Sequence, residues 1–282
     1  MDIEDWYHLD YFYSSKCSKE YSMLDGIGKY CELLNEHNIP SSFFVVGELV
    51  KSIRATLHDL SKDGNDIASH GWAHLRPMTL SVNQFQKEII KTKEVIEDAI
   101  SFPVEGYRAP CFSLNRERLD IVENAGYLYD SSRINFSAHP LYETIDMDSY
   151  TPVINNIYRI NNFLEFEVTT KKILNRNVPI SGGGYIRLLP WFLTNSMIKS
   201  YLKLGDLYVL YIHPFELSTK LNPPFPIETK WQTKLRFGMG RKTVSEKLSK
   251  LILLLKDSGY CFTTFSLLRK ELLSQDNKKL DG

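Results

Sequence analysis

Two histidines stand four positions apart in ASHGWAHLRP, residues 68–77, directly behind an apolar, strand-like lead-in. An H-x3-H spacing can place both imidazoles on one side of a helical turn or tight loop, so His70 and His74 are candidates to share a metal ion. An isolated pair of this kind is more often two surface residues at a helix start. The pair becomes informative only if the fold brings a carboxylate to it.

The opening of the chain, MDIEDWYH, supplies more than one such carboxylate, at Asp2, Glu4 and Asp5. Two imidazoles and one carboxylate leave a coordination position open for water, which is the usual arrangement around a catalytic divalent metal. The competing interpretation is a solvated acidic end, because the ends of chains are often frayed.

Two further residues with chemical potential follow apolar runs. Arg108 in GYRAPCF could hold a carboxylate bidentately, in a turn that the following proline stiffens. His213 in LYVLYIHP ends a strongly apolar run, where an imidazole is either satisfied by a neighbour or catalytic. Neither signal is specific by itself.

The elements that must position these side chains alternate between strands and helices. Apolar runs bounded by turn residues predict strands at 41–47, 66–70, 106–110, 127–132, 163–168, 207–214 and 261–265. Helical spacing predicts helices at 25–38, 81–100, 115–126 and 243–259. Such βα units form a mostly parallel sheet or barrel, whose chemistry gathers at the carboxyl ends of the strands. His70, Arg108, Asp130 and His213 each end a predicted strand, so we expect one common site.

Composition narrows the function classes. The chain has 282 residues with 34 basic and 34 acidic side chains, and zero net charge argues against a nucleic-acid-binding protein. The four cysteines include no C-x-x-C pair, which argues against a structural zinc site or a disulfide framework. The apolar run at 251–255 is far shorter than the ~20 residues of a membrane span. No signal peptide opens the chain as given, so a cytoplasmic location is expected.

The order of five motifs, DIED, SHGWAH, YRAP, YDSS and YIHP, resembles the NodB-homology polysaccharide deacetylases, carbohydrate esterase family four. The stretches at 181–191, 236–242 and 262–265 look like the branch associated with bacterial exopolysaccharide biosynthesis and export. The resemblance covers about residues 1–268. It implies an α/β fold of the distorted (β/α) barrel type, with one catalytic domain over 1–282 and 226–282 as a C-terminal extension packed on it.

The resemblance also implies roles for individual residues. A divalent metal, Zn²⁺ by expectation, would bind His70 and His74, and the substrate would be an N-acetylated glycan that loses acetate. The catalytic residues would be the base Asp2, the arginine Arg108 that orients it, the acid His213, and Asp130, which would tune that acid.

Three departures from the family pattern affect these assignments. The family has adjacent aspartates, whereas here the metal carboxylate is Glu4, on the same strand face as Asp2, or Asp5, which needs a turn that begins at once. The tyrosine after the Arg-Pro motif is Cys111, which is harmless if only its backbone N–H serves the oxyanion. The family's first strand is missing before Met1, so an upstream start is expected.

Trp72 and Tyr185 could stack on sugar rings, although core packing is at least as probable for each aromatic side chain. The glycines 182–184 lack a phosphate-loop pattern and are expected to form a turn near the cleft. Two other functions compete with a metal-dependent deacetylase. The two histidines count against a metal-independent, allantoinase-like amide hydrolase, and the base and acid candidates count against a non-catalytic glycan-binding module.

Overall fold

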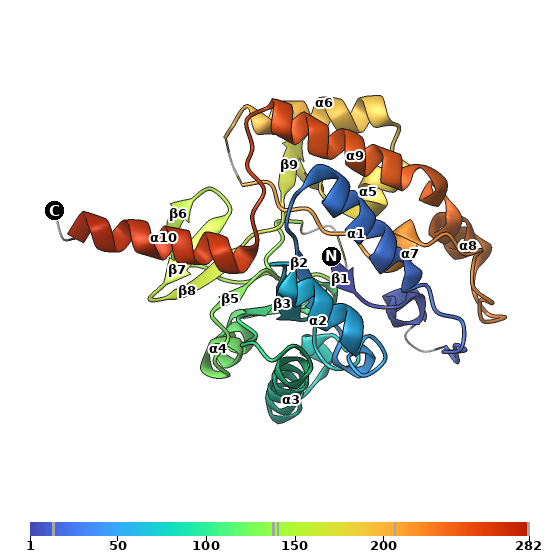
Figure 1. The fold of residues 1–282 in the computed structure, drawn as a ribbon, viewed down its shortest axis with the longest axis horizontal. Helices are drawn as coiled ribbons and strands as arrows, with labels where there is room; N and C mark the ends of the chain where they lie inside the picture. The colour runs from blue at the N-terminus through green and yellow to red at the C-terminus, as the bar shows by residue number, and fades with distance from the viewer. Residues whose placement is uncertain (13–14, 137–138, 140, 206, 281–282) are drawn as a thin grey trace.

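The computed structural model describes residues 1–280 apart from 13–14, 137–138, 140 and 206, and it describes side chains up to residue 275. Within these residues one sheet runs in the order β1-β2-β3-β4-β5-β8-β7-β6 (Figure 1). Neighbours from β1 to β8 in this order are parallel, and β7 and β6 add an antiparallel edge. The bounds are β1 Asp2–Ile3, β2 Ser42–Val45, β3 Asp66–Ser69, β4 Gly106–Tyr107, β5 Tyr129–Asp130, β6 Thr151–Ile154, β7 Ile157–Ile160 and β8 Phe163–Phe166.

Irregular pairing closes the parallel part of the sheet into a distorted barrel, as expected. The backbone N–H of Asp2 donates to the carbonyl of Ile212 (2.9 Å), and Tyr211 in turn forms a parallel bridge with Gly182. The hydroxyl of Thr169, just past β8, accepts from the backbone N–H of Val209 (2.8 Å). The segment 207–214 therefore has the place of a barrel strand, but side chains and single bridges replace a regular ladder.

Helices cover the barrel in two groups (Figure 1). One side carries α1 Asp25–His37, α5 Gly183–Leu188, α6 Trp191–Leu202 and α9 Arg241–Asp257, and the other carries α2 Arg54–Lys62, α3 Val82–Ile100 and α4 Arg116–Asn124. The remaining helices are α7 Pro214–Leu217, α8 Trp231–Gly238 and α10 Phe265–Leu280. Among the described residues, no helix is long and apolar enough to cross a bilayer.

The long helices begin where local sequence chemistry predicts. Ser81 caps α3, because its hydroxyl accepts from the backbone N–H of Gln84 while the Gln84 side chain accepts from the Ser81 N–H. The apolar positions of α3 then recur at helical spacing and face the barrel, where Phe85, Ile89 and Ile96 are buried. α9 buries one apolar face in the same way and packs on α1.

The sequence was less informative about the irregular parts. The strand predicted at 261–265 is wrong, because residues 261–264 form a connection outside the sheet and Phe265 is the first residue of α10. The β6–β7 hairpin and the separate hairpin of β9 Thr170–Ile173 and β10 Arg176–Pro179 were not predicted. Short apolar runs do not reveal whether a partner strand is present, since pairing depends on distant segments.

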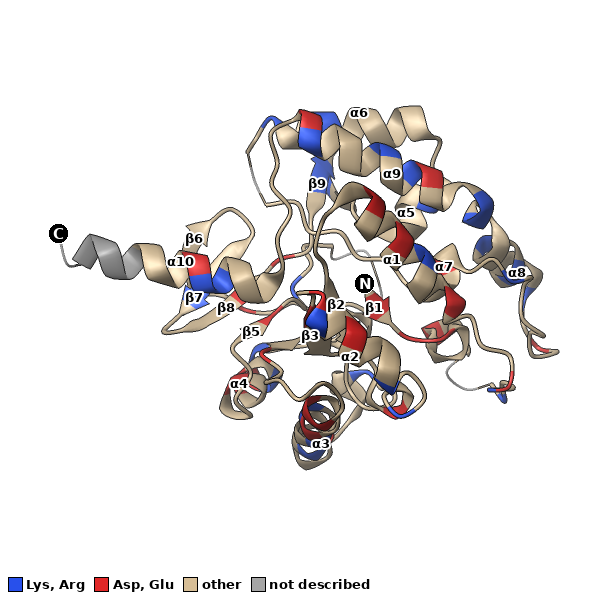
Figure 2. Cartoon of the chain, viewed as in Figure 1, with Lys and Arg blue, Asp and Glu red and all other residues tan. Residues whose placement is uncertain are grey.

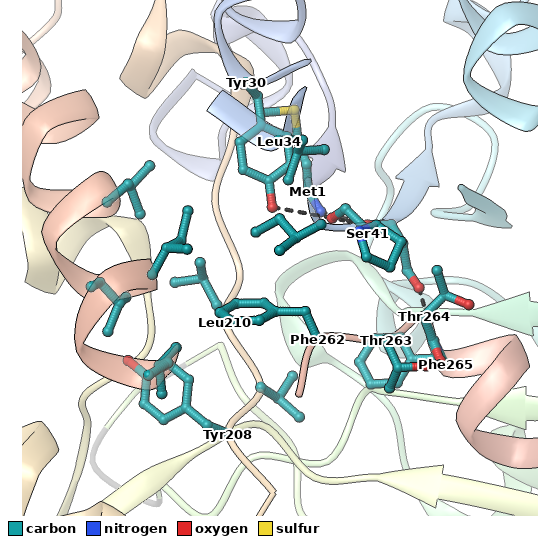
Figure 3. Close-up of a pocket in the computed structure, with 18 of the residues that line it drawn as sticks. Met1, Tyr30, Leu34, Ser41, Tyr208, Leu210, Phe262, Thr263, Thr264 and Phe265 are labelled. Carbon is teal, nitrogen blue, oxygen red and sulfur yellow. Dashed lines mark hydrogen bonds between the residues drawn. The ribbon is translucent and has the colours of Figure 1, made fainter. Parts of the chain in front are cut away.

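The two ends of the barrel differ in chemistry. A mostly apolar cavity of about 130 Å³ lies where the strands begin, and Met1, Tyr30, Leu34, Phe262 and Phe265 contribute to its walls (Figure 3). A larger cleft of about 370 Å³ lies where the strands end, and it contains carboxylates and imidazoles. The second end is therefore the candidate for chemistry.

Candidate active site

Three strand ends deliver polar side chains to the lining of this cleft, and a fourth delivers an arginine that contacts one of them from outside the lining. Asp2 lies on β1, His70 directly follows β3, Arg108 directly follows β4, and His213 follows the segment that closes the barrel. Asp2, His70 and Arg108 are almost fully buried, and the His213 side chain is 19% exposed. The sequence led us to expect His70, Arg108, Asp130 and His213 at one end of the sheet; the structure places His70, Arg108 and His213 together there, with Asp2 beside them.

Glu4, His70 and His74 form a group that could hold a metal ion. One ligand atom from each lies within 4.8 Å of the others, and all three residues are buried. Oε2 of Glu4 lies 2.6 Å from Nε2 of His74, at an ion-pair distance but without the geometry of a hydrogen bond. A buried carboxylate oxygen without a well-formed hydrogen bond is costly, and a cation held between it and the imidazoles would satisfy it. The donor set therefore fits a divalent metal.

The environment of His70 suits a ligand. Its Nδ1–H donates to the backbone carbonyl of Arg108 (2.8 Å), which leaves Nε2 unprotonated. Burial lowers the pKa of His70 to about 4, although the carboxylates of Asp2 and Glu4 oppose the shift. The imidazole is therefore neutral at physiological pH, as metal binding requires.

Asp5 lies outside this group. Its Oδ1 accepts from the backbone N–H of Trp6 (2.8 Å) and of Met23 (2.9 Å), and it caps the short 3-10 helix Trp6–His8. The turn that Asp5 would have needed does begin at once, but the Asp5 carboxylate caps that turn and is not part of the group formed with His70 and His74. Of the two carboxylates that the sequence left open, the structure brings only Glu4 to the histidines.

Asp2 and Arg108 form a buried ion pair. An Nη1–H of Arg108 donates to Oδ1 of Asp2 (2.7 Å), and the other nitrogens of the guanidinium donate to the carbonyl and hydroxyl of Ser131. Burial alone would raise the pKa of Asp2, but Arg108 and the neighbouring histidines hold it well below its usual range. Asp2 is therefore ionised and fixed in orientation, which a general base requires.

His213 has a carboxylate partner that the sequence did not reveal. Its Nδ1 lies 3.2 Å from Oε2 of Glu216, and its Nε2 lies 3.5 Å from Oε1 of Glu4. Burial would lower the pKa of His213, but the hydrogen bond with Glu216 and the two negative charges raise it to about 9. Arg187 in turn holds Glu216 (3.2 Å). The spacing H-P-F-E, three residues apart at a helix start, was the available signal.

Asp130 does not contact His213, so the expectation that it tunes the acid is wrong. Its carboxylate instead accepts from the hydroxyl and backbone N–H of Ser132 (both 2.8 Å). The carboxylate of Asp130 lies beside that of the equally buried Glu165. Burial raises the pKa of Asp130 to about 6. Burial and the neighbouring Asp130 raise the pKa of Glu165 well above its usual range. The Ser132 hydroxyl accepts from Ala109 N–H (2.8 Å), so Asp130 supports the turn after Arg108.

The three residues expected to bind substrate do not all lie in the cleft. Cys111 and Tyr185 line the cleft, and Cys111 has a φ of 54° in the turn after Arg108. Trp72 lies outside the cleft lining; its ring packs under the ammonium group of Lys91, 3.2 Å from the ring centroid. Trp72 is therefore packed beside Lys91 of α3, and its expected role in sugar binding stays a prediction.

Glu88 is a supporting residue that sequence reasoning missed. Its Oε1 accepts from the backbone N–H of Trp72 (2.8 Å), in the loop between the two candidate metal ligands. That loop is conformationally demanding, because Gly71 has a φ of 72° and His74 a φ of 56°. A glutamate in the middle of α3 carries no local signal for this role, since its partner is brought by tertiary packing.

Comparison with known proteins agrees with this geometry. Residues 25–129 match the polysaccharide deacetylase family model, and residues 131–268 match a domain of unknown function, DUF3473. Similarity to the polysaccharide deacetylase family model thus lies in the N-terminal part of the chain. The structure is also similar to that of a Mycobacterium smegmatis protein assigned as a polysaccharide deacetylase, with a TM-score of 0.60 at 16% identity over 90% of this chain and 79% of that one.

Two curated proteins are similar in sequence to part of this chain. A peptidoglycan deacetylase of Helicobacter pylori is 22% identical over 128 residues, which are 45% of this chain and 43% of that protein. The peptidoglycan-N-acetylmuramic acid deacetylase PdaC of Bacillus subtilis is 26% identical over 144 residues, 49% of this chain and 31% of that protein. The matches thus span less than half of either relative.

Proposed function

We propose that this protein is a metal-dependent hydrolase that removes N-acetyl groups from an N-acetylated glycan and releases acetate. The observation that carries the proposal is the convergence of Glu4, His70 and His74 on one point of the cleft that Asp2 and His213 also line. We take zinc as the ion, because two neutral imidazoles and one carboxylate with an open position are typical of catalytic zinc. The motifs at 181–191 and 236–242 support an exopolysaccharide as the polymer.

The residues of the chain divide the reaction between them. A bound divalent cation would supply Lewis acidity toward water and the acetamide carbonyl. Asp2, held ionised by Arg108, accepts the proton of the attacking water. The backbone N–H of Cys111 donates to the carbonyl oxygen as negative charge develops there. His213 donates a proton to the nitrogen as the C–N bond breaks, because an unprotonated amide nitrogen is a very poor leaving group.

Acetate release from a panel of N-acetylated glycans tests this function. The purified protein, loaded with zinc, should release acetate from N-acetylglucosamine oligomers or an N-acetylated exopolysaccharide, and a chelator should stop it. Asp2→Asn should retain zinc but lose activity, whereas His70→Ala with His74→Ala should lose both. Zinc binding without acetate release from any glycan would instead favour a glycan-binding module, and full activity of the metal-free protein would favour the allantoinase-like alternative.

A further inference from the structure

The segment 220–242 exposes a group of large apolar side chains beside the cleft. Within residues 221–239 the exposed fractions are 84% for Leu221, 99% for Ile227, 68% for Trp231, 52% for Leu235 and 46% for Met239. Single exposed apolar residues are common on soluble proteins and need no explanation. Five such residues in one short segment are an unusual concentration, and concentrations of exposed apolar groups often mark interaction sites.

Tight packing of the same segment shows that this exposure does not come from a loose chain. Phe225 and Phe237 point inward and pack with Phe12, at ring-centroid distances of 5.7 and 6.3 Å. Arg241 donates to the carbonyls of Ser218 and Lys220 (2.8 and 2.9 Å) and so ties the two ends of the segment together. The apolar side chains therefore stand on an anchored scaffold.

The geometry of α8 gives the exposed surface a direction. Trp231 and Leu235 are one turn apart and lie on the same helix face, while the buried Phe237 faces the protein. Lys234 and Arg236 fall on the two flanks of the apolar stripe at helical spacing. An apolar stripe with basic flanks is the pattern of helices that lie in a membrane interface.

The charge of this surface also sets it apart. Residues 220–242 contain six basic side chains and one acidic side chain, although the whole chain has no net charge. Figure 2 shows this concentration of Lys and Arg over α8 and the adjoining end of α9. Glu228 is the single acidic residue in the segment, so the surface attracts anions overall.

We propose that residues 221–239, with the flanking lysines and arginines, dock this protein on an anionic membrane surface. A second copy of the chain is a poorer occupant, because a two-fold contact would bring the same positive charges together. Four of the five exposed apolar side chains are non-aromatic, and the fifth, Trp231, is of the type that membrane interfaces favour. Arg236 and Phe237 also line the cleft, so docking would present the cleft mouth beside the membrane. This inference is independent of the proposed function.

Vesicle binding tests the proposal directly. The full chain should co-sediment with vesicles of phosphatidylglycerol and phosphatidylcholine at low salt, and much less with phosphatidylcholine alone or at high salt. The double variant Trp231→Ser, Leu235→Ser should lose binding. The double variant Lys230→Gln, Lys234→Gln should weaken binding to the anionic vesicles by roughly fivefold for each lysine. A matched control, Phe192→Ser with Leu204→Ser, removes side chains that are 68% and 66% exposed near α6 and should bind as the parent does.

Three results would overturn the proposal. The first is that the parent chain does not bind anionic vesicles at low salt, and the second is that the variant Trp231→Ser, Leu235→Ser binds as well as the control. The third is that light scattering shows an oligomer that only this variant converts to a monomer, which would assign this surface to self-association. Circular dichroism and thermal unfolding of each variant would establish that it is folded. Acetate release is not used as a readout, so a failure here says nothing about catalysis.

Discussion

Nδ1 of His213 lies 3.2 Å from the carboxylate of Glu216, and the two residues are the N-cap and the third residue of the same short helix, α7. The carboxylate also accepts from the backbone N–H of His213 (3.2 Å). One side chain therefore fixes both the orientation and the charge of the candidate acid. This pairing is local in sequence, and it determines how the site should respond to pH.

Glu216→Gln should lower the pKa of His213. In the metal-free protein the pKa of His213 is raised to about 9. The stabilisation that the His213–Glu216 pair gives the fold is therefore complete at pH values below 6.5, the ordinary pKa of histidine, and it is lost as the pH rises through about 9. The difference in free energy of unfolding between parent and variant should therefore shrink from about pH 6 to about pH 10. Urea unfolding at both pH values measures it. Glu246→Gln, at an exposed pair with Lys250, is the control and should show no such trend.

Glu4→Ala and Asp5→Ala should have opposite phenotypes. Glu4→Ala removes a carboxylate from the metal group, so elemental analysis should find little zinc in a folded protein. Asp5→Ala removes a cap that accepts two backbone N–H groups, so it should keep zinc and lose about 1–2 kcal/mol of stability. If Asp5→Ala lost zinc and Glu4→Ala retained it, Asp5 would be the metal ligand and Glu4 would not.

His213→Ala should discriminate between leaving groups. Loss of general acid catalysis should slow amide hydrolysis by about 100- to 10,000-fold. An activated acetate ester, whose leaving group needs no protonation, should be affected much less. Both rates are to be measured on the same zinc-loaded variant. Equal losses of the amide and ester hydrolysis rates would mean that His213 positions the substrate or supports the fold of the site, and does not protonate the leaving group.

Glu88→Ala should weaken zinc binding without touching the metal. The carboxylate accepts from the loop that carries His74, and loss of such outer support typically costs about 10- to 100-fold in metal affinity. Glu88→Gln keeps an acceptor and should restore most of the affinity. Competition with a chromophoric chelator measures it. Lys91→Gln removes the cation over Trp72 but leaves the carboxylate, and it should bind zinc as the parent does.

Gly183→Ala should damage the site, whereas Gly184→Ala should have little effect. A Cβ at Gly183 would overlap the carboxylate of Glu216, but a Cβ at Gly184 would meet no atom within 4 Å. The first variant must displace Glu216 from His213 and should lose activity and about 1–3 kcal/mol of stability. A pH–rate profile and thermal unfolding of both variants provide the comparison. Wild-type values for Gly183→Ala would show that Glu216 can move without consequence.

The sequence by itself determined the barrel class, the principal helices and most of the strand ends that carry the site. Period and capping are local properties, so Ser81 marks the start of α3 without any knowledge of the fold. The alternation of strands and helices then implies that His70, Arg108 and His213 meet at one edge, because parallel strands end on the same side.

Only the tertiary structure decided which carboxylate serves which partner. The carboxylate of Asp5 accepts a hydrogen bond from the backbone N–H of Met23, which is distant in sequence, and it is not part of the metal group. The carboxylate of Asp130 accepts from Ser132 and interacts with Glu165. A carboxylate near a motif has several possible partners, and its partner is chosen by which donors packing brings within hydrogen-bond reach. Composition and spacing do not contain those distances, so the ligand set had to come from the fold, whereas the partner of the acid, Glu216, lies only three residues along the chain.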